Sequence, residues 1–168
     1  METNVQQSQN RPVGMTILLV LSFINACWNI FRAIIMYFTT PRMAEMFDNG
    51  QFDEMMKPFA SMGEDFTKAM TDSMNILTQI NPNYYLILLV LFIASLVGVI
   101  KMFKVNKTGF HIYSIAQICM LIDHSVFVYT LQKPSPFFSD FLFTAIFILL
   151  YYLYFKRMEA PQDLQNQE

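Results

Sequence analysis

The chain has 168 residues, of which 54% are apolar, 15% aromatic and only 14% charged, with a formal net charge of −2. A soluble domain normally carries more charge and fewer aromatic residues, and here the apolar residues form blocks long enough to span a membrane. The small net charge, with no Lys/Arg cluster among aromatic residues, argues against nucleic acid as a partner.

The first element follows a polar tail. Residues 1–12 are rich in Gln and Asn, and we expect a disordered cytoplasmic tail there. Residues 13–38 are apolar over a length that predicts transmembrane helix 1. This start is similar to a secretory signal, but the apolar run continues past Cys27 to Phe38, so we expect an anchor that is not cleaved.

Four polar residues interrupt the first segment at spacings of three, four and three, so they share one stripe of a helix. They are Ser22, Asn25, Asn29 and Arg32. A polar stripe faces lipid only at a high cost in free energy, so we expect it to face protein or a water-filled cavity.

Residues 39–83 are acidic and carry Met and Phe at helical spacing. We expect an extracytoplasmic helical domain of two or three helices. Thr40-Pro41 would begin its first helix and Asn49-Gly50 would end it, while Pro58 would begin or kink the second. Its apolar face predicts a partner-binding surface, because adaptable thioether side chains suit an interface better than a metal site without His or Cys. The residues of this surface are Phe52, Met55, Phe59, Met62, Phe66 and Met70.

Three more apolar segments follow. Residues 84–103, 108–131 and 137–156 predict transmembrane helices 2, 3 and 4, and residues 157–168 predict a cytoplasmic tail. The fold class expected is an all-α integral membrane protein, a four-transmembrane-helix antiparallel bundle. Between spans one and two it would carry the helical extracytoplasmic insertion. Lipid bilayer is therefore an expected contact.

Basic residues close to the predicted spans indicate the orientation. They gather at one end of the bundle, as Lys101, Lys104, Lys107, Lys156 and Arg157. Positive charge is enriched in cytoplasmic loops, so we expect both termini in the cytoplasm and a multi-pass protein of the bacterial inner membrane.

The third span contains Gln117, Asp123 and His124. Counted from the outer ends of their helices, Asp123 and His124 match Arg32 in depth and Gln117 matches Asn25, which predicts contact between spans one and three. One hypothesis is a structural clasp between Arg32 and Asp123. The other is a proton or ion relay in which His124 titrates near neutral pH. We favour the clasp, because the chain lacks the repeats and broken helices typical of transporters.

Motifs for catalysis are missing from the sequence: it has no Gly-x-Ser-x-Gly, no His-Glu-x-x-His and no phosphate-binding glycine loop. We expect no enzyme, no cofactor and no metal site. Gly98 and Gly109 fit close packing or a helix start. Cys27 and Cys119 lie in apolar segments and predict buried small residues with no disulfide.

Two runs carry a resemblance: Arg-Pro-x-x-Met-Thr-Ile-Leu at 11–18 and Lys-x-Gly-Phe-x-x-Tyr-Ser-x-Ala-Gln at 107–117. They resemble small uncharacterised four-span bacterial inner-membrane proteins. The resemblance covers the spans and not the acidic block, and it implies an architecture without an activity. It implies that a helix starts at the cytoplasmic interface with Lys107, Gly109, Phe110 and Tyr113.

The function expected from the sequence is that of a non-enzymatic accessory or scaffolding subunit, which binds a membrane-protein partner or a second copy through residues 39–83. The alternative is a small proton- or ion-coupled transporter or channel component that uses Arg32, Asp123 and His124.

Overall fold

The structure is a computed structural model that describes residues 13–104, 106–132 and 136–159, and these ranges consist of helices and turns. The helices are α1 (Val13–Asp48), α2 (Gln51–Met56), the short 3₁₀ helix η1 (Lys57–Met62), α3 (Glu64–Gln79), α4 (Asn83–Phe103), α5 (Lys107–Phe127) and α6 (Phe137–Glu159). The all-α prediction is confirmed. The predicted tail at 1–12 lies outside the described residues, as do residues 160–168 of the predicted tail at 157–168, while residues 157–159 continue α6.

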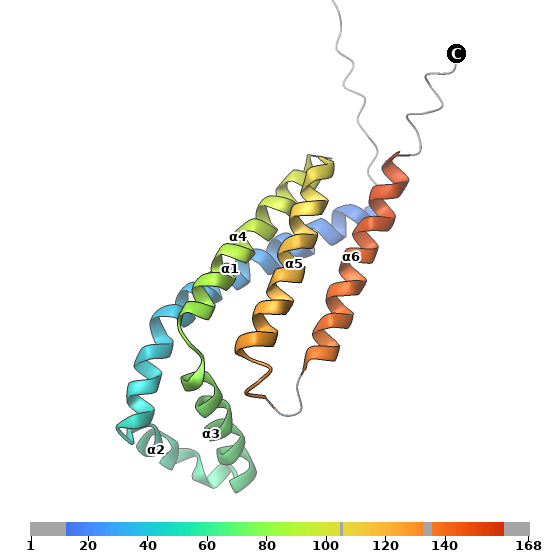
Figure 1. Cartoon of the computed structure of the whole chain (residues 1–168). Helices are drawn as coiled ribbons and strands as arrows, with labels where there is room; N and C mark the ends of the chain where they lie inside the picture. The colour runs from blue at the N-terminus through green and yellow to red at the C-terminus, as the bar shows by residue number, and fades with distance from the viewer. Residues whose placement is uncertain (1–12, 105, 133–135, 160–168) are drawn as a thin grey trace, which may run out of the picture.

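The four long helices lie side by side, and the chain reverses direction from one to the next along the bundle (Figure 1). Helix α5 packs most extensively on α4, α4 packs on α1, and α6 has fewer contacts with α5. The start of α1, the α4–α5 turn and the end of α6 lie at one end of the bundle, which we call the lysine-turn end. Helices α2 and α3 lie beyond the opposite end, which we call the α3 end.

Within the described residues, three helices are long and apolar enough to cross a membrane: α1, α4 and the Phe137–Tyr154 part of α6. Helix α5 has the same 21-residue length as α4, but Gln117, Asp123 and His124 lower its mean hydropathy. A helix rises 1.5 Å per residue, so the 36 residues of α1 span about 54 Å and extend well beyond a bilayer core of about 30 Å.

The predicted helix start at Thr40-Pro41 is wrong, because α1 continues through Pro41 as far as Asp48. Proline removes one backbone hydrogen bond in a helix interior, and it normally bends or ends the helix. Here Thr40 is buried and the last turns of α1 pack against α2 and α3. Packing on neighbouring helices therefore outweighs the local preference of the proline.

The predicted break at Asn49-Gly50 is confirmed, since α1 ends at Asp48 and Gly50 has a φ of 70°. A positive φ is easily adopted only by glycine, and it turns the chain back sharply. Helix α2 thereby folds against the end of α1, where the rings of Phe47 and Phe52 lie 5.6 Å apart. Pro58 lies in the first turn of η1, so the predicted helix start at Pro58 is confirmed.

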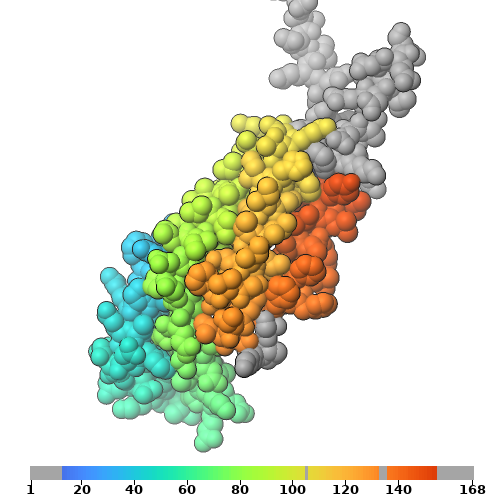
Figure 2. Space-filling model, viewed as in Figure 1, coloured from blue at the N-terminus to red at the C-terminus, as the bar shows by residue number. Residues whose placement is uncertain are grey.

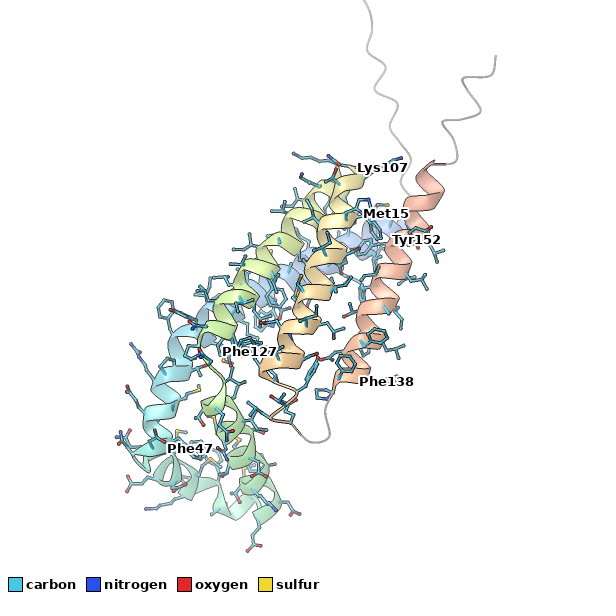
Figure 3. All side chains as sticks on the ribbon, viewed as in Figure 1. Met15, Phe47, Lys107, Phe127, Phe138 and Tyr152 are labelled. Carbon is cyan, nitrogen blue, oxygen red and sulfur yellow. The ribbon has the colours of Figure 1, made fainter. Side chains whose placement is uncertain are left out.

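At the lysine-turn end the helices pack tightly. Leu19 and Val99 have no exposed surface, and Tyr151 is 1% exposed. Figure 2 shows the side chains of α4 and α5 as one continuous surface. In Figure 3, Met15 and Tyr152 lie at this end, near Lys107, while Phe127 and Phe138 mark the other end of the bundle.

Close contact between α4 and α5 depends on two glycines. A Cβ atom added to Gly109 would lie 2.6 Å from the carbonyl oxygen of Gly98 and 2.7 Å from the amide nitrogen of Met102. A Cβ added to Gly98 would lie 2.8 Å from the amide nitrogen of Tyr113. The close-packing prediction for both glycines is confirmed, because only hydrogen fits where the two backbones meet.

Candidate functional site

The polar residues that the sequence predicts as one intramembrane cluster lie in three separate places. Ser22 contacts Tyr151 of α6. Gln117 contacts Ser95 of α4. Asn29 and Arg32 line a pocket with His124 of α5. The polar stripe of α1 therefore faces different neighbours along its length, because α1 crosses obliquely behind α4 and α5 towards α6 (Figure 1).

Ser22 belongs to the tightly packed lysine-turn end. The hydroxyl of Tyr151 donates a hydrogen bond either to the Ser22 Oγ, at 2.7 Å, or to the Leu18 carbonyl oxygen, at 3.0 Å. Tyr151 and Ser22 are both buried, and the Tyr113 ring lies 5.0 Å from the Tyr151 ring in an edge-on arrangement. This contact joins α1 to α6 and has the character of a structural bond.

Asn25 and Gln117 do not form the depth-matched pair that the sequence suggests. The Asn29 Nδ2 donates to the Asn25 Oδ1 at 2.9 Å, within α1. The Gln117 Nε2 donates to the Ser95 Oγ at 3.3 Å, so its hydrogen bond joins α5 to α4. Each amide side chain thus has a partner, although not the one expected from helix depth alone.

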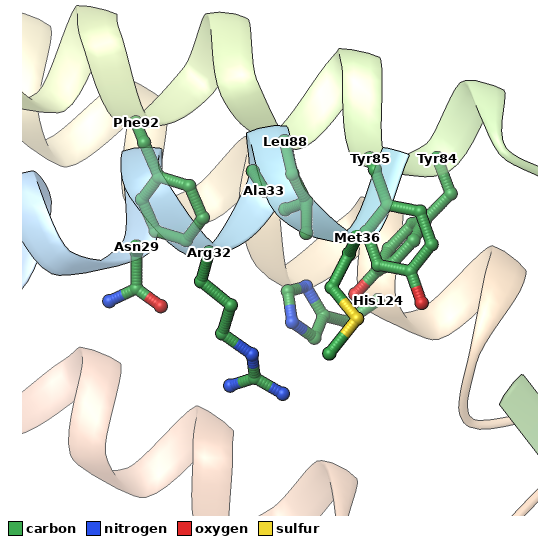
Figure 4. Close-up of a pocket in the computed structure, with 9 residues that line it drawn as sticks. All are labelled: Asn29, Arg32, Ala33, Met36, Tyr84, Tyr85, Leu88, Phe92 and His124. Carbon is green, nitrogen blue, oxygen red and sulfur yellow. The ribbon is translucent and has the colours of Figure 1, made fainter. Parts of the chain in front are cut away.

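The Arg32 pocket, at the α3 end, combines polar groups with apolar walls (Figure 4). It is formed by α1, α4 and α5 and is lined by Asn29, Arg32, Ala33, Met36, Tyr84, Tyr85, Leu88, Phe92 and His124. Figure 4 shows Asn29 and Arg32 pointing away from α4, with the guanidinium group at the mouth. Arg32 and His124 line the same pocket, although α1 packs mainly on α4 and not on α5.

His124 is held in place by one hydrogen bond and by two aromatic rings. Its Nδ1 lies 2.8 Å from the carbonyl oxygen of Met120, and this nitrogen must donate because a carbonyl can only accept. The imidazole ring also lies edge-on to the Tyr84 ring at 5.6 Å and 6.0 Å from the Tyr129 ring. His124 is therefore oriented by aromatic neighbours and by its own helix.

Asp123 lies apart from Arg32. Its side chain is 7% exposed, it does not line the pocket, and its Oδ2 is buried without a hydrogen-bond partner among the described residues. Arg32 is exposed, and in the part of the chain that the structure describes the two side chains form no ion pair. The predicted Arg32–Asp123 clasp is therefore absent from this arrangement of the helices.

The predicted partner-binding surface is exposed except at one position. Phe52 is 4% exposed, because the turn at Gly50 directs it against Phe47 of α1. The exposed fractions of the others range from 39% for Phe66 to 61% for Met62. We call these exposed residues the Met/Phe face; they are Met55, Phe59, Met62, Phe66 and Met70.

The predicted basic residues lie at the lysine-turn end. Lys101 is in the last turn of α4, Lys104 caps that helix and Lys107 begins α5. Lys156 and Arg157 belong to the last turn of α6 at the same end of the bundle (Figure 1). The start of α5 at Lys107 agrees with the helix start expected at this position, and the Asn106 side chain caps it by accepting from the Thr108 amide at 3.0 Å.

The sequence did not single out the aromatic pocket residues. Tyr84 and Tyr85 are both buried, and both line the Arg32 pocket. Their position after Pro82 at the start of a long apolar helix was the available signal, and it is equally typical of residues at a membrane surface.

Within the described ranges, no group of three or more His, Cys, Asp and Glu side chains is placed to hold a metal ion. Cys27 and Cys119 are free thiols, and Cys27 is exposed, contrary to the expected burial. No protein-family model, curated protein or solved structure matches the chain. The resemblance of residues 11–18 and 107–117 to four-span proteins therefore stays a prediction.

Proposed function

We propose that the chain is a non-enzymatic membrane protein that binds a protein partner, or a second copy of itself, through the Met/Phe face. The exposure of that face is the observation that carries the proposal. Residues 39–83 contain seven acidic and three basic residues, yet large apolar side chains remain exposed along η1 and α3. Large apolar side chains exposed on an otherwise charged block favour an interface.

Membrane adsorption explains the face less well. An acidic block is repelled by anionic lipid, so only its apolar area would favour adsorption. Methionine and phenylalanine together suit a protein surface, because the flexible thioether chain adapts to an irregular partner. An accessory or scaffolding role in a larger membrane complex follows from such a surface.

We also propose that α5 is a fourth span. It matches α4 in length, it packs on α4 through Gly98 and Gly109, and its polar residues Gln117 and Asp123 are directed into protein and not to the outside. The basic residues at the lysine-turn end then support cytoplasmic termini in a bacterial inner membrane, with residues 39–83 outside the cytoplasm.

Two substitutions on the Met/Phe face test the proposal. Phe59→Asp combined with Phe66→Asp should release the partner or dissociate the oligomer, because two carboxylates would have to be buried without partners. The measurement is native mass spectrometry of the complex extracted from membranes without overexpression.

The matched control carries the same added charge. Ser61→Asp with Ser73→Asp lies in the same block at exposed polar positions and should leave the mass unchanged. A complex that survives the double Phe substitution intact would mean that this face packs internally and that the proposed interface is wrong.

The alternative function is a small proton- or ion-coupled transporter or channel component that uses Arg32, Asp123 and His124. The shared pocket of Arg32 and His124 favours it. The separation of Asp123 from that pocket weakens it, because a relay needs its groups within hydrogen-bond reach of one another or of a bridging water.

A further inference from the structure

The Arg32 pocket holds a positive charge that the described part of the chain does not neutralise. Arg32 forms no ion pair there, and Asp123 is buried elsewhere on α5. Six residues separate Arg32 from Phe38 at the end of the predicted span, which places the guanidinium group about 9 Å along the helix from that end. A cation at such a depth is unfavourable unless it reaches the head-group region or binds an anion.

The groups around Arg32 suit the head of an amphiphile. Asn29, Tyr85 and His124 make this side of the pocket polar. The Asn29 amide donates within α1 and the His124 Nδ1 donates to Met120, so the guanidinium group is the donor that an anion would use. Arg binds phosphate and carboxylate oxygens in two parallel hydrogen bonds, which fixes the orientation of the anion. The opposite wall of the pocket is apolar, with Leu88 and Phe92 from α4.

The pocket is reached from the apolar side of the molecule. On the exposed side of α1 beside Arg32, Trp28 is 63% exposed, Phe31 56% and Ile35 41%. In Figure 4 the Arg32 side chain points away from α4, so its guanidinium group is not buried in the α1–α4 interface. A molecule that arrives along this surface must itself be soluble in lipid.

We propose that the Arg32 pocket binds the phosphate of an anionic membrane phospholipid, one whose head group carries no cation of its own. Arg32 forms the ion pair, through parallel hydrogen bonds from its guanidinium group to two phosphate oxygens. The first carbons of the acyl chain pack against Leu88 and Phe92. This binding site is independent of the Met/Phe face and of the partner proposed above.

The chain contains its own probe for this site. Trp28 is the only tryptophan, and it lies one helical turn before Arg32. The full-length protein is reconstituted into vesicles that contain either brominated phosphatidylglycerol or brominated phosphatidylcholine at equal mole fractions. Bromine quenches tryptophan fluorescence on contact, so quenching reports which lipid lies beside Trp28. The anionic lipid should associate about fivefold more strongly, which corresponds to one additional ion pair near the membrane surface.

Three variants decide whether the preference comes from the pocket. Arg32→Gln should reduce the ratio of the two association constants to about one, whereas Arg32→Lys should retain most of it because the positive charge remains. Arg42→Gln removes the same residue type from the same helix outside the pocket, and should leave the ratio unchanged. Arg32 is exposed and unpaired within the described residues, so Arg32→Gln should unfold at the same temperature as the unsubstituted protein.

Several outcomes would overturn the proposal. Equal quenching by both lipids in the unsubstituted protein would exclude a selective site. A preference that survives Arg32→Gln, or that Arg42→Gln lowers as much, would mean that it arises from general surface charge. Inorganic phosphate, added in excess over lipid, tests whether the pocket binds free phosphate and not the phosphate of a lipid. If it abolishes the preference, the pocket takes a free anion and the lipid assignment is wrong.

Discussion

The two ends of the helix bundle differ in whether their polar side chains have partners within the chain. At the lysine-turn end, Tyr151 and Ser22 bond to each other in a region where Leu19 and Val99 have no exposed surface. At the α3 end, the Arg32 side chain stands at the mouth of an open pocket and makes no ion pair within the described part of the chain.

This difference indicates a structural role at the lysine-turn end and a binding role at the α3 end. A buried polar group with its partner in the same chain contributes to helix association, and it has no free donor or acceptor for a ligand. A cation without an ion-pair partner, among polar groups and beside apolar walls, has the composition of a binding site. The same stripe of α1 therefore serves packing at Ser22 and recognition at Arg32.

The largest effect on stability should come from adding a side chain where α4 and α5 meet at the lysine-turn end. Gly109→Ala adds a Cβ against backbone atoms of Gly98 and Met102, which cannot turn aside as a side chain can. The alanine gains about 1 kcal/mol of helix propensity, but separating α4 from α5 should lower stability by about 3 kcal/mol. Thermal unfolding in detergent measures the change.

Gly14→Ala is the matched control for that substitution. Its Cβ would collide only with the hydroxyl end of Tyr154, a side chain that can move, so the unfolding temperature should change little. Equal losses at both glycines would show that the α4–α5 contact is not the tightest part of the bundle.

A smaller loss is expected from removing the hydroxyl that joins α1 to α6. Tyr151→Phe leaves the Ser22 hydroxyl buried without this partner and should reduce stability by about 1 kcal/mol. Tyr152→Phe provides the comparison, because Tyr152 is 48% exposed and lies beside it in sequence. The same unfolding measurement should find Tyr152→Phe neutral; a neutral Tyr151→Phe would contradict the structural role assigned to this end.

The smallest effect has the opposite sign and lies at the α3 end. Asp123 has a buried carboxylate oxygen without a partner among the described residues, so Asp123→Leu should raise stability by up to about 1 kcal/mol. Asp140→Asn should instead lower it, because the Asp140 Oδ2 accepts a 2.5 Å hydrogen bond from the Tyr129 hydroxyl. Destabilisation by Asp123→Leu would indicate that this carboxylate has a partner in the membrane, and would revive the clasp or the relay.

The contacts of single residues show where prediction from the sequence succeeds. Gly98 and Gly109 fit close packing or a helix start from the sequence, and small residues are typical where two helix backbones approach closely. Asn49-Gly50 was identified as a helix break because glycine adopts a positive φ far more easily than other residues. Both predictions depend on the missing side chain of glycine, which a sequence records directly.

Pairings between helices were predicted less well. Depth counted along each helix placed Arg32 level with Asp123, but depth leaves the rotation of each helix undetermined. In the structure, Asp123 is turned into the bundle and its neighbour His124 faces the Arg32 pocket. Each residue along a helix rotates the side chain by about 100° around the axis. A correctly predicted depth therefore does not determine which neighbouring side chain a residue contacts.

The sequence by itself determined the helical class, the apolar segments, the acidic Met/Phe-rich block and the gathering of basic residues near the chain's predicted membrane ends. These follow from composition and spacing, which act within one element. Only the tertiary structure decided that α1 continues through Pro41, that Phe52 is buried and that Arg32 shares a pocket with Tyr84, Tyr85 and His124. Each of these depends on how helices cross and rotate against one another, and that is set by the fit of many side chains together.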